Sequence, residues 1–123
     1  MAEKPTILVV EDDADCRSVL QDLLELNGYV VRTCADAREA VSEARAATPA
    51  LMLLDYLMPD ADGAWVVQKL REAGGALARV PVVLTTGSNE GRLIAESLGV
   101  RSLEKPFDVA RLLDVVQSLV PKG

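Results

Sequence analysis

The sequence predicts a single α/β domain in which helices cover both faces of a five-stranded parallel sheet. Three observations indicate this fold class. Short apolar runs alternate five times with segments of helical periodicity along the 123 residues. Most of these runs are apolar from end to end, as in strands that are buried on both faces. Right-handed crossovers between such units give a doubly wound, flavodoxin-like sheet with strand order 2-1-3-4-5.

The first part of the chain predicts a strand, a helix and a second strand. Residues 6–10 are continuously apolar, whereas residues 30–34 form a partly polar run that suits a sheet edge. Residues 14–27 between them have helical spacing, and Gly28 is placed as the left-handed residue that ends the helix. The buried stripe of this helix is expected to consist of Val19, Leu20, Leu23 and Leu24.

The middle of the chain predicts the centre of the sheet. Asp36 and Glu39 have capping-box spacing at the start of a second helix over residues 37–47. Residues 50–54 are the most continuously apolar run and should form the central strand. A third helix is expected over residues 63–73, where two glycines end it.

The last part of the chain completes the alternation. Residues 80–85 predict the fourth strand, and residues 89–98 a short helix that Gly99 closes. Residues 102–104 predict a brief fifth strand, after which Asp108 caps the last helix. The apolar positions of that helix, at helical spacing, are Val109, Leu112, Leu113, Val116, Leu119 and Val120.

Composition excludes several functional classes. Thirteen basic residues against nineteen acidic ones give a net charge of −6, and Lys and Arg form no cluster, so direct nucleic-acid binding is not expected. The apolar run near the start is too short for a signal peptide or membrane insertion, which predicts a cytoplasmic protein. Cys16 and Cys34 have no CxxC spacing and the chain has no histidine, so we expect reduced structural thiols and no zinc site.

Polar side chains follow the strands at one edge of the predicted sheet. Doubly wound sheets bind ligands at the carboxyl ends of their strands, where the winding direction switches. The residues at these ends are Glu11, Asp12 and Asp13 after the first strand, Asp55 after the third, Thr85 and Thr86 after the fourth and Lys105 after the fifth. Carboxylates gathered in a crevice repel one another, and Mg²⁺ prefers such oxygen ligands. With a lysine and a hydroxyl opposite, Asp55 has the surroundings of a nucleophile for covalent phosphoryl transfer.

Four motifs resemble those of response-regulator receiver domains in two-component signal transduction. They are VVEDD at 9–13, LLDYLMPDADG at 53–63, PVVLTTG at 81–87 and EKPF at 104–107. Each motif alone is weak, but their combination at the ends of four strands is specific. The resemblance extends from Ile7 to Val120, and residues 1–123 are therefore expected to be one receiver domain, with a core of about 6–120 and no output domain.

The resemblance implies a role for each site residue. Asp55 would be the phospho-acceptor and, with Asp12, would ligate Mg²⁺ directly. The backbone carbonyl of Leu57 would supply another metal ligand, and Glu11 would act through a metal-bound water.

The same resemblance implies how the phosphoryl group is held and read. Lys105 would pair with the phosphoryl oxygens, and Thr86 would be the switch hydroxyl, with Thr85 structural. The bond between Lys105 and Pro106 matches the cis peptide of the family.

Partners follow from the resemblance as well. A sensor histidine kinase or a histidine phosphotransfer protein would donate the phosphoryl group, and a downstream effector protein would bind according to phosphorylation. The protein would be no enzyme beyond catalysing its own aspartyl phosphorylation and dephosphorylation. The first helix, with Arg17, Leu20 and Gln21, would dock the kinase.

Two departures from the family leave an alternative open. Ser102 stands where an aromatic residue usually reports phosphorylation, and the segment from Thr86 to Lys105 is short. The alternative is a degenerate receiver that works as a scaffold without phosphorylation.

A dehalogenase-like phosphatase is disfavoured, because it needs a second acid where Leu57 stands. Nearby residues are expected to be structural: Asp13 or Asp15 as a helix cap, Asp60 as a solvated loop acid, Asp62 as a loop acid or helix cap, and Trp65 in packing.

Overall fold

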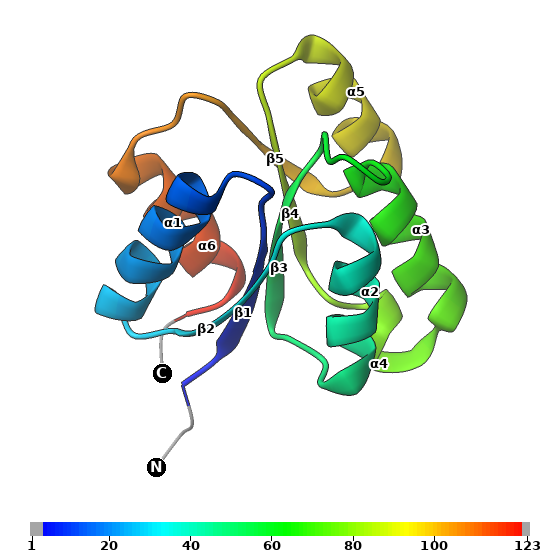
Figure 1. Ribbon diagram of the computed structural model, residues 1–123, viewed down its shortest axis with the longest axis horizontal. Coiled ribbons are helices and arrows are strands. Elements are labelled where there is room, and N and C mark those ends of the chain that lie inside the picture. The colour runs from blue at the N-terminus through cyan, green and yellow to red at the C-terminus, as the bar shows by residue number, and fades with distance from the viewer. Residues whose placement is uncertain (1–3, 122–123) are drawn as a thin grey trace.

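The computed structural model describes residues 4–121 and confirms the predicted fold class (Figure 1). Five parallel strands lie in the order β2-β1-β3-β4-β5. The strands are β1 (Thr6–Val10), β2 (Val30–Cys34), β3 (Leu51–Asp55), β4 (Val82–Thr86) and β5 (Arg101–Glu104). The helices are α1 (Ala14–Leu26), α2 (Ala37–Ala46), α3 (Gly63–Ala73), α4 (Gly75–Ala78), α5 (Asn89–Leu98) and α6 (Val109–Leu119). Figure 1 shows α1 and α6 on one face of the sheet and the other helices on the opposite face.

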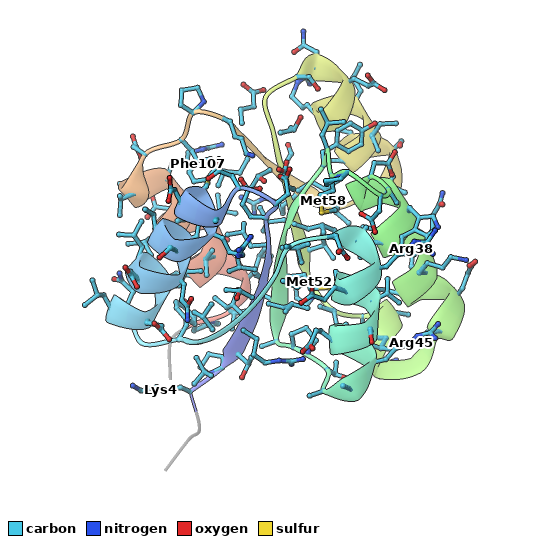
Figure 2. The ribbon with its side chains drawn as sticks, viewed as in Figure 1. Lys4, Arg38, Arg45, Met52, Met58 and Phe107 are labelled. Atoms are coloured by element: carbon cyan, nitrogen blue, oxygen red, sulfur yellow. The ribbon has the colours of Figure 1, made fainter. Side chains whose placement is uncertain are left out.

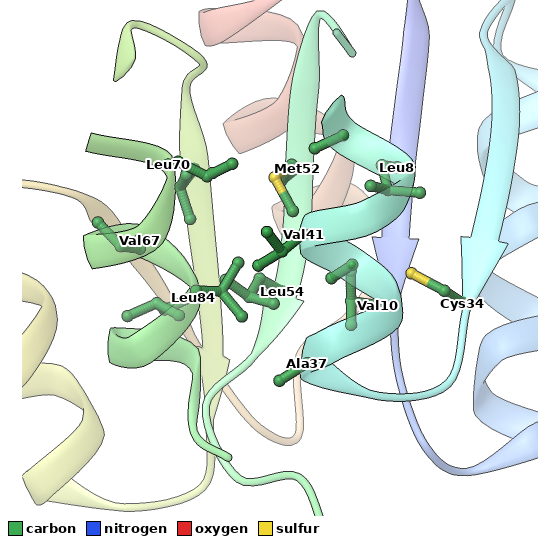
Figure 3. Packing of buried hydrophobic residues seen from close by; sticks show 14 of the residues in the cluster. Leu8, Val10, Cys34, Ala37, Val41, Met52, Leu54, Val67, Leu70 and Leu84 are labelled. Carbon is green, nitrogen blue, oxygen red and sulfur yellow. The ribbon is translucent and has the colours of Figure 1, made fainter. Parts of the chain in front are cut away.

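Apart from polar residues at their ends, the central strands β1, β3 and β4 are apolar, because each one contributes to two cores. In β1, Ile7 and Val9 belong to the core under α1 and α6, whereas Leu8 and Val10 belong to the core under α2 and α3. Figure 3 shows the second core, where Leu8, Met52 and Leu54 lie beneath α2. Alternate side chains of a strand point to opposite faces of a sheet, so both sets must be apolar.

The five longer helices all begin at a side chain that caps them. Each capping oxygen accepts a hydrogen bond from the backbone N–H three residues further on, which satisfies one of the unpaired amides of the first turn. The caps are Asp13 for α1, Asp36 for α2, Asp62 for α3, Ser88 for α5 and Asp108 for α6. The four aspartates confirm the predicted caps, and Ser88 is an addition.

Two parts of the predicted helices are wrong. Val19 of α1 is 56% exposed, whereas Leu20 and Leu24 are buried and Cys16 and Leu23 pack partly against the same core. Similarly, Val109 of α6 is exposed and Val115, which the predicted stripe lacked, is buried. After Gly74 ends α3, Gly75 begins the short helix α4, so residues 4–121 contain one more helix than predicted.

None of the helices among residues 4–121 has both the length and the apolar character needed to cross a membrane. Cys16 and Cys34 are free thiols, as expected. Trp65 packs partly against the core on the α2 and α3 side, which confirms its predicted structural role.

Asp60 is an exposed loop acid, as predicted, but it also has a structural contact that the sequence did not indicate. Its carboxylate accepts hydrogen bonds from the backbone N–H groups of Ala37 and Arg38, both at 3.0 Å. Burial on its own would raise the pKa of Asp60, but these backbone hydrogen bonds outweigh it and hold the pKa below its ordinary value. The loop after β3 is therefore fastened to the first turn of α2.

We expect Asp60→Ala to lower the free energy of unfolding by about 1 kcal/mol, since two helix amides lose their acceptor. Asp60→Asn should lose much less, because an amide oxygen can still accept. The pKa of Asp60 is depressed in the folded state, so its contribution is present above the ordinary carboxyl pKa and is lost as the pH falls through the folded value. Urea unfolding of both variants at neutral and acid pH measures this, and equal stability of wild type and Asp60→Ala at neutral pH would contradict it.

Candidate functional site

Three carboxylates gather at the carboxyl ends of β1 and β3. Val10 is paired with Leu54 in the parallel register, so the residues that follow in each strand emerge side by side. One carboxylate oxygen from each of Glu11, Asp12 and Asp55 lies within 4.8 Å of the others. Glu11 and Asp55 are buried and Asp12 is exposed. The structure therefore brings together three of the residues that the sequence singled out.

Lys105 brings a cation to the same cluster from the loop after β5. Its Nζ atom lies 3.2 Å from Asp55 Oδ2 and 3.6 Å from Glu11 Oε1. Burial alone would lower the pKa of Lys105, but the two carboxylates outweigh it and raise the pKa, so the ammonium stays charged. Its backbone N–H donates to the carbonyl of Thr86, and the following bond to Pro106 is cis, as predicted.

The cluster has more negative charge than one lysine compensates. Burial, together with the neighbouring Asp55, raises the pKa of Glu11 to about 7. Its Oε2 atom is buried and has no hydrogen-bond partner among the described residues. A buried oxygen without a donor and adjacent carboxylates are the surroundings that a hard divalent cation stabilises. The residues present thus fit a Mg²⁺ ion.

The start of α1 and the loop before α6 form the walls beside this cluster. Arg17 donates to the backbone carbonyl of Glu11 at 2.8 Å, which fixes the turn after β1. Cys16 is near enough to Glu11 that burial and this carboxylate raise the pKa of its thiol to about 11. A hollow of about 440 Å³ lies between Cys16, Lys105, Pro106 and Phe107. Figure 2 shows Phe107 in the loop above α1 and Met58 in the loop after β3, both at this edge of the sheet.

Thr86 is turned toward α5 in this structure. Its hydroxyl accepts from the backbone N–H of Ser88 at 3.1 Å and lies 3.3 Å from both the carbonyl and the hydroxyl oxygen of that residue. Thr85 is buried and lies opposite Asp55 in the register of the two strands. The switch role of Thr86 stays a prediction.

Other predicted positions have mixed outcomes. The side chain of Leu57 is 68% exposed, and the metal-ligand role of its carbonyl stays a prediction. Leu20 is only 6% exposed, so it is a core residue of α1 and the interpretation of it as a docking contact is wrong. Ser102 is half-buried and, with Arg92 and Arg111 among others, lines a hollow of about 450 Å³.

Sequence reasoning missed one contact of the site. Tyr56 directly follows Asp55, is buried, and donates from its hydroxyl to Glu90 Oε1 at 3.3 Å. Burial, and then the charge of Glu90, raise the pKa of Tyr56, so the phenol stays protonated. The two residues are far apart in the sequence, and no spacing rule joins them.

This arrangement coincides with a known family. The chain matches the response regulator receiver domain over residues 7–117 and belongs to that family. The response regulator Rre1 of a Synechocystis species is 35% identical to it, over 99% of this chain and 54% of that protein. The chemotaxis protein CheY4 of Vibrio cholerae has a TM-score of 0.86 at 29% identity, over 97% of this chain and 100% of that one.

A further solved structure bears on the acidic cluster. The receiver domain of the sensor histidine kinase PA1611 from Pseudomonas aeruginosa, solved with a magnesium ion coordinated in its active-site cleft, has a TM-score of 0.86 and 30% identity. The match covers 96% of this chain and 98% of that one. The chain spans about half the length of the first curated relatives it matches. It is thus a receiver domain of the two-component response-regulator class.

Proposed function

We propose that Asp55 accepts a phosphoryl group from a phosphohistidine of a partner protein. The observation that carries this proposal is the position of Lys105 Nζ, 3.2 Å from Asp55 Oδ2, inside a cluster of three carboxylates. Asp55 ends the central strand and is 7% exposed, so its carboxylate is held in place beside the ammonium of Lys105. A nucleophile beside a fixed cation is suited to phosphoryl transfer, which depends on positioning and charge neutralisation.

The transfer itself exchanges one bond for another. A carboxylate oxygen of Asp55 forms a bond to phosphorus as the phosphorus–nitrogen bond to the donor imidazole breaks. The imidazole nitrogen keeps the bonding electrons and takes up a proton. Lys105 would then pair with the phosphoryl oxygens, and Thr86 would donate to them after leaving Ser88.

Asp12 and Asp55 would hold Mg²⁺ directly, the Leu57 carbonyl would add a ligand, and Glu11 would act through a water. When bound, the ion would neutralise the carboxylates and the charge of the transferred group. The buried, unpartnered Oε2 of Glu11 supports this assignment, because it has no donor among the described residues. A bound cation would satisfy that oxygen and would offset the repulsion between the neighbouring carboxylates.

Signalling would pass through protein contacts. We propose that a sensor histidine kinase or a histidine phosphotransfer protein is the donor. An effector protein would then distinguish the phosphorylated form from the unphosphorylated one. The chain's own catalysis would be limited to forming and hydrolysing its aspartyl phosphate. Direct nucleic-acid binding is not part of this proposal. The cytoplasmic location stays a prediction. So does the assignment of residues 1–123 as one domain without an output domain, since the first curated relatives are about twice as long as this chain.

The proposal is tested by intact mass after incubation with acetyl phosphate. We expect one phosphoryl adduct in Mg²⁺ and none in EDTA, because the carboxylates need a cation before an anionic donor can approach. A protein that takes up no phosphoryl group from acetyl phosphate or from a phosphorylated kinase would contradict the proposal. That outcome would favour the degenerate scaffold.

A further inference from the structure

The first turn of α5 is attached to the ends of two neighbouring strands. From the β3 side, the hydroxyl of Tyr56 donates to Glu90 at 3.3 Å. From the β4 side, the hydroxyl of Thr86 accepts from the backbone N–H of Ser88, the residue that caps this helix. Tyr56 directly follows the proposed phospho-acceptor, so both attachments begin at the phosphoryl site.

The attachment at Thr86 is tightly packed. A Cβ atom built on Gly91 would lie 2.1 Å from the Oγ1 atom of Thr86 and 2.6 Å from its Cβ. Thr86 is 3% exposed, so it has no solvent-filled space into which to move aside. Because buried side chains at such close range move together, a rotation of Thr86 alters the packing of the first turn of α5.

Two hydrogen bonds hold the backbone of Tyr56 in place. The backbone N–H of Tyr56 donates to Thr85 at 2.9 Å, and its carbonyl accepts from Gly63 at 2.7 Å. Tyr56 is 5% exposed, and its hydroxyl donates to Glu90 Oε1. A rigidly held donor bonded to a carboxylate on the helix favours one position of that helix.

We propose that the Tyr56–Glu90 hydrogen bond is a latch that holds α5 in the position of the unphosphorylated protein. The inference rests on the proposed function. Turning the Thr86 hydroxyl toward a phosphoryl group on Asp55 would break its contacts with Ser88, which would release one attachment of α5. The Tyr56–Glu90 bond is the second attachment, and its strength then sets how readily the helix follows. A contact that stabilises one position of α5 lowers the apparent affinity for any ligand that binds the protein with α5 in the other position.

The test uses beryllofluoride, a mimic of the phosphoryl group, bound to the whole chain in Mg²⁺ and measured by calorimetry. Tyr56→Phe and Glu90→Ala should each bind it about fivefold more tightly than wild type, the change expected for loss of one hydrogen bond. The double variant should bind no more tightly than either single variant, since both remove the same bond. Glu90→Gln keeps an acceptor oxygen and should behave as wild type.

Tyr29→Phe is the matched control, because Tyr29 is buried and its hydroxyl donates to the carbonyl of Val120, away from α5. It should lower the thermal midpoint without changing beryllofluoride affinity, which separates a latch from a general loss of packing. Unchanged affinity in Tyr56→Phe and Glu90→Ala, or additive effects in the double variant, would overturn the latch alone. A wild-type protein that binds no beryllofluoride and takes up no phosphoryl group would overturn the proposed function, and the latch with it.

Discussion

Asp55→Asn is expected to take up no phosphoryl group from acetyl phosphate in Mg²⁺ while keeping the fold. The amide has no anionic oxygen to attack phosphorus, and the change removes one of the two carboxylates that would ligate the metal ion directly. We expect intact-mass spectra of this variant to show no phosphoryl adduct, because the reaction cannot proceed without the nucleophilic carboxylate.

A matched control is available in the same loop. Asp62 caps α3 by accepting from the N–H of Trp65 at 2.9 Å, and asparagine caps helices equally well. Asp62→Asn should therefore keep both stability and phosphoryl uptake. Uptake by Asp55→Asn equal to that of wild type would remove the basis for the proposed function.

Lys105→Gln is expected to destabilise the metal-free protein and to slow phosphorylation strongly. The change leaves Glu11 and Asp55 without the ammonium that lies 3.6 Å and 3.2 Å from them. We expect a loss of roughly 2 kcal/mol, less than for a fully buried pair because the lysine is about one-third exposed. Saturating Mg²⁺ should recover much of this stability, because a ligand that binds only the folded state stabilises it.

Urea unfolding with and without Mg²⁺ measures both parts of this expectation. Lys69→Gln is a suitable control, since Lys69 forms an exposed ion pair with Glu72 on α3, and such pairs contribute little. If Lys105→Gln and Lys69→Gln unfolded at the same urea concentration in EDTA, Lys105 would not compensate the cluster.

Much of the site could be predicted from the sequence because parallel strands end at a common edge. The polar residues after β1, β3 and β5 had to converge there once the strands were assigned. The structure bears this out for Glu11, Asp12, Asp55 and Lys105. The strand positions were predictable for a similar reason, since runs buried on both faces are apolar at every position.

The features that sequence reasoning missed depend on contacts between distant segments. The carboxylate of Asp60 bonds to α2, and the hydroxyl of Tyr56 to α5, across separations that no local pattern encodes. Helical periodicity placed Val19 in the buried stripe of α1, but periodicity does not fix how wide that stripe is, and Val19 is exposed. The direction of the Thr86 hydroxyl, which contacts Ser88, is also not encoded in strand or helix periodicity.

The most direct test of the central claim is the location of the phosphoryl group. Borohydride reduces an aspartyl phosphate to homoserine, so treating the phosphorylated protein and sequencing its peptides by mass spectrometry marks the acceptor. We predict homoserine at position 55 alone, formed only in samples that contained Mg²⁺. Homoserine at Asp12 or another acid, or a phosphorylated protein with none at position 55, would contradict the assignment of Asp55 as the acceptor.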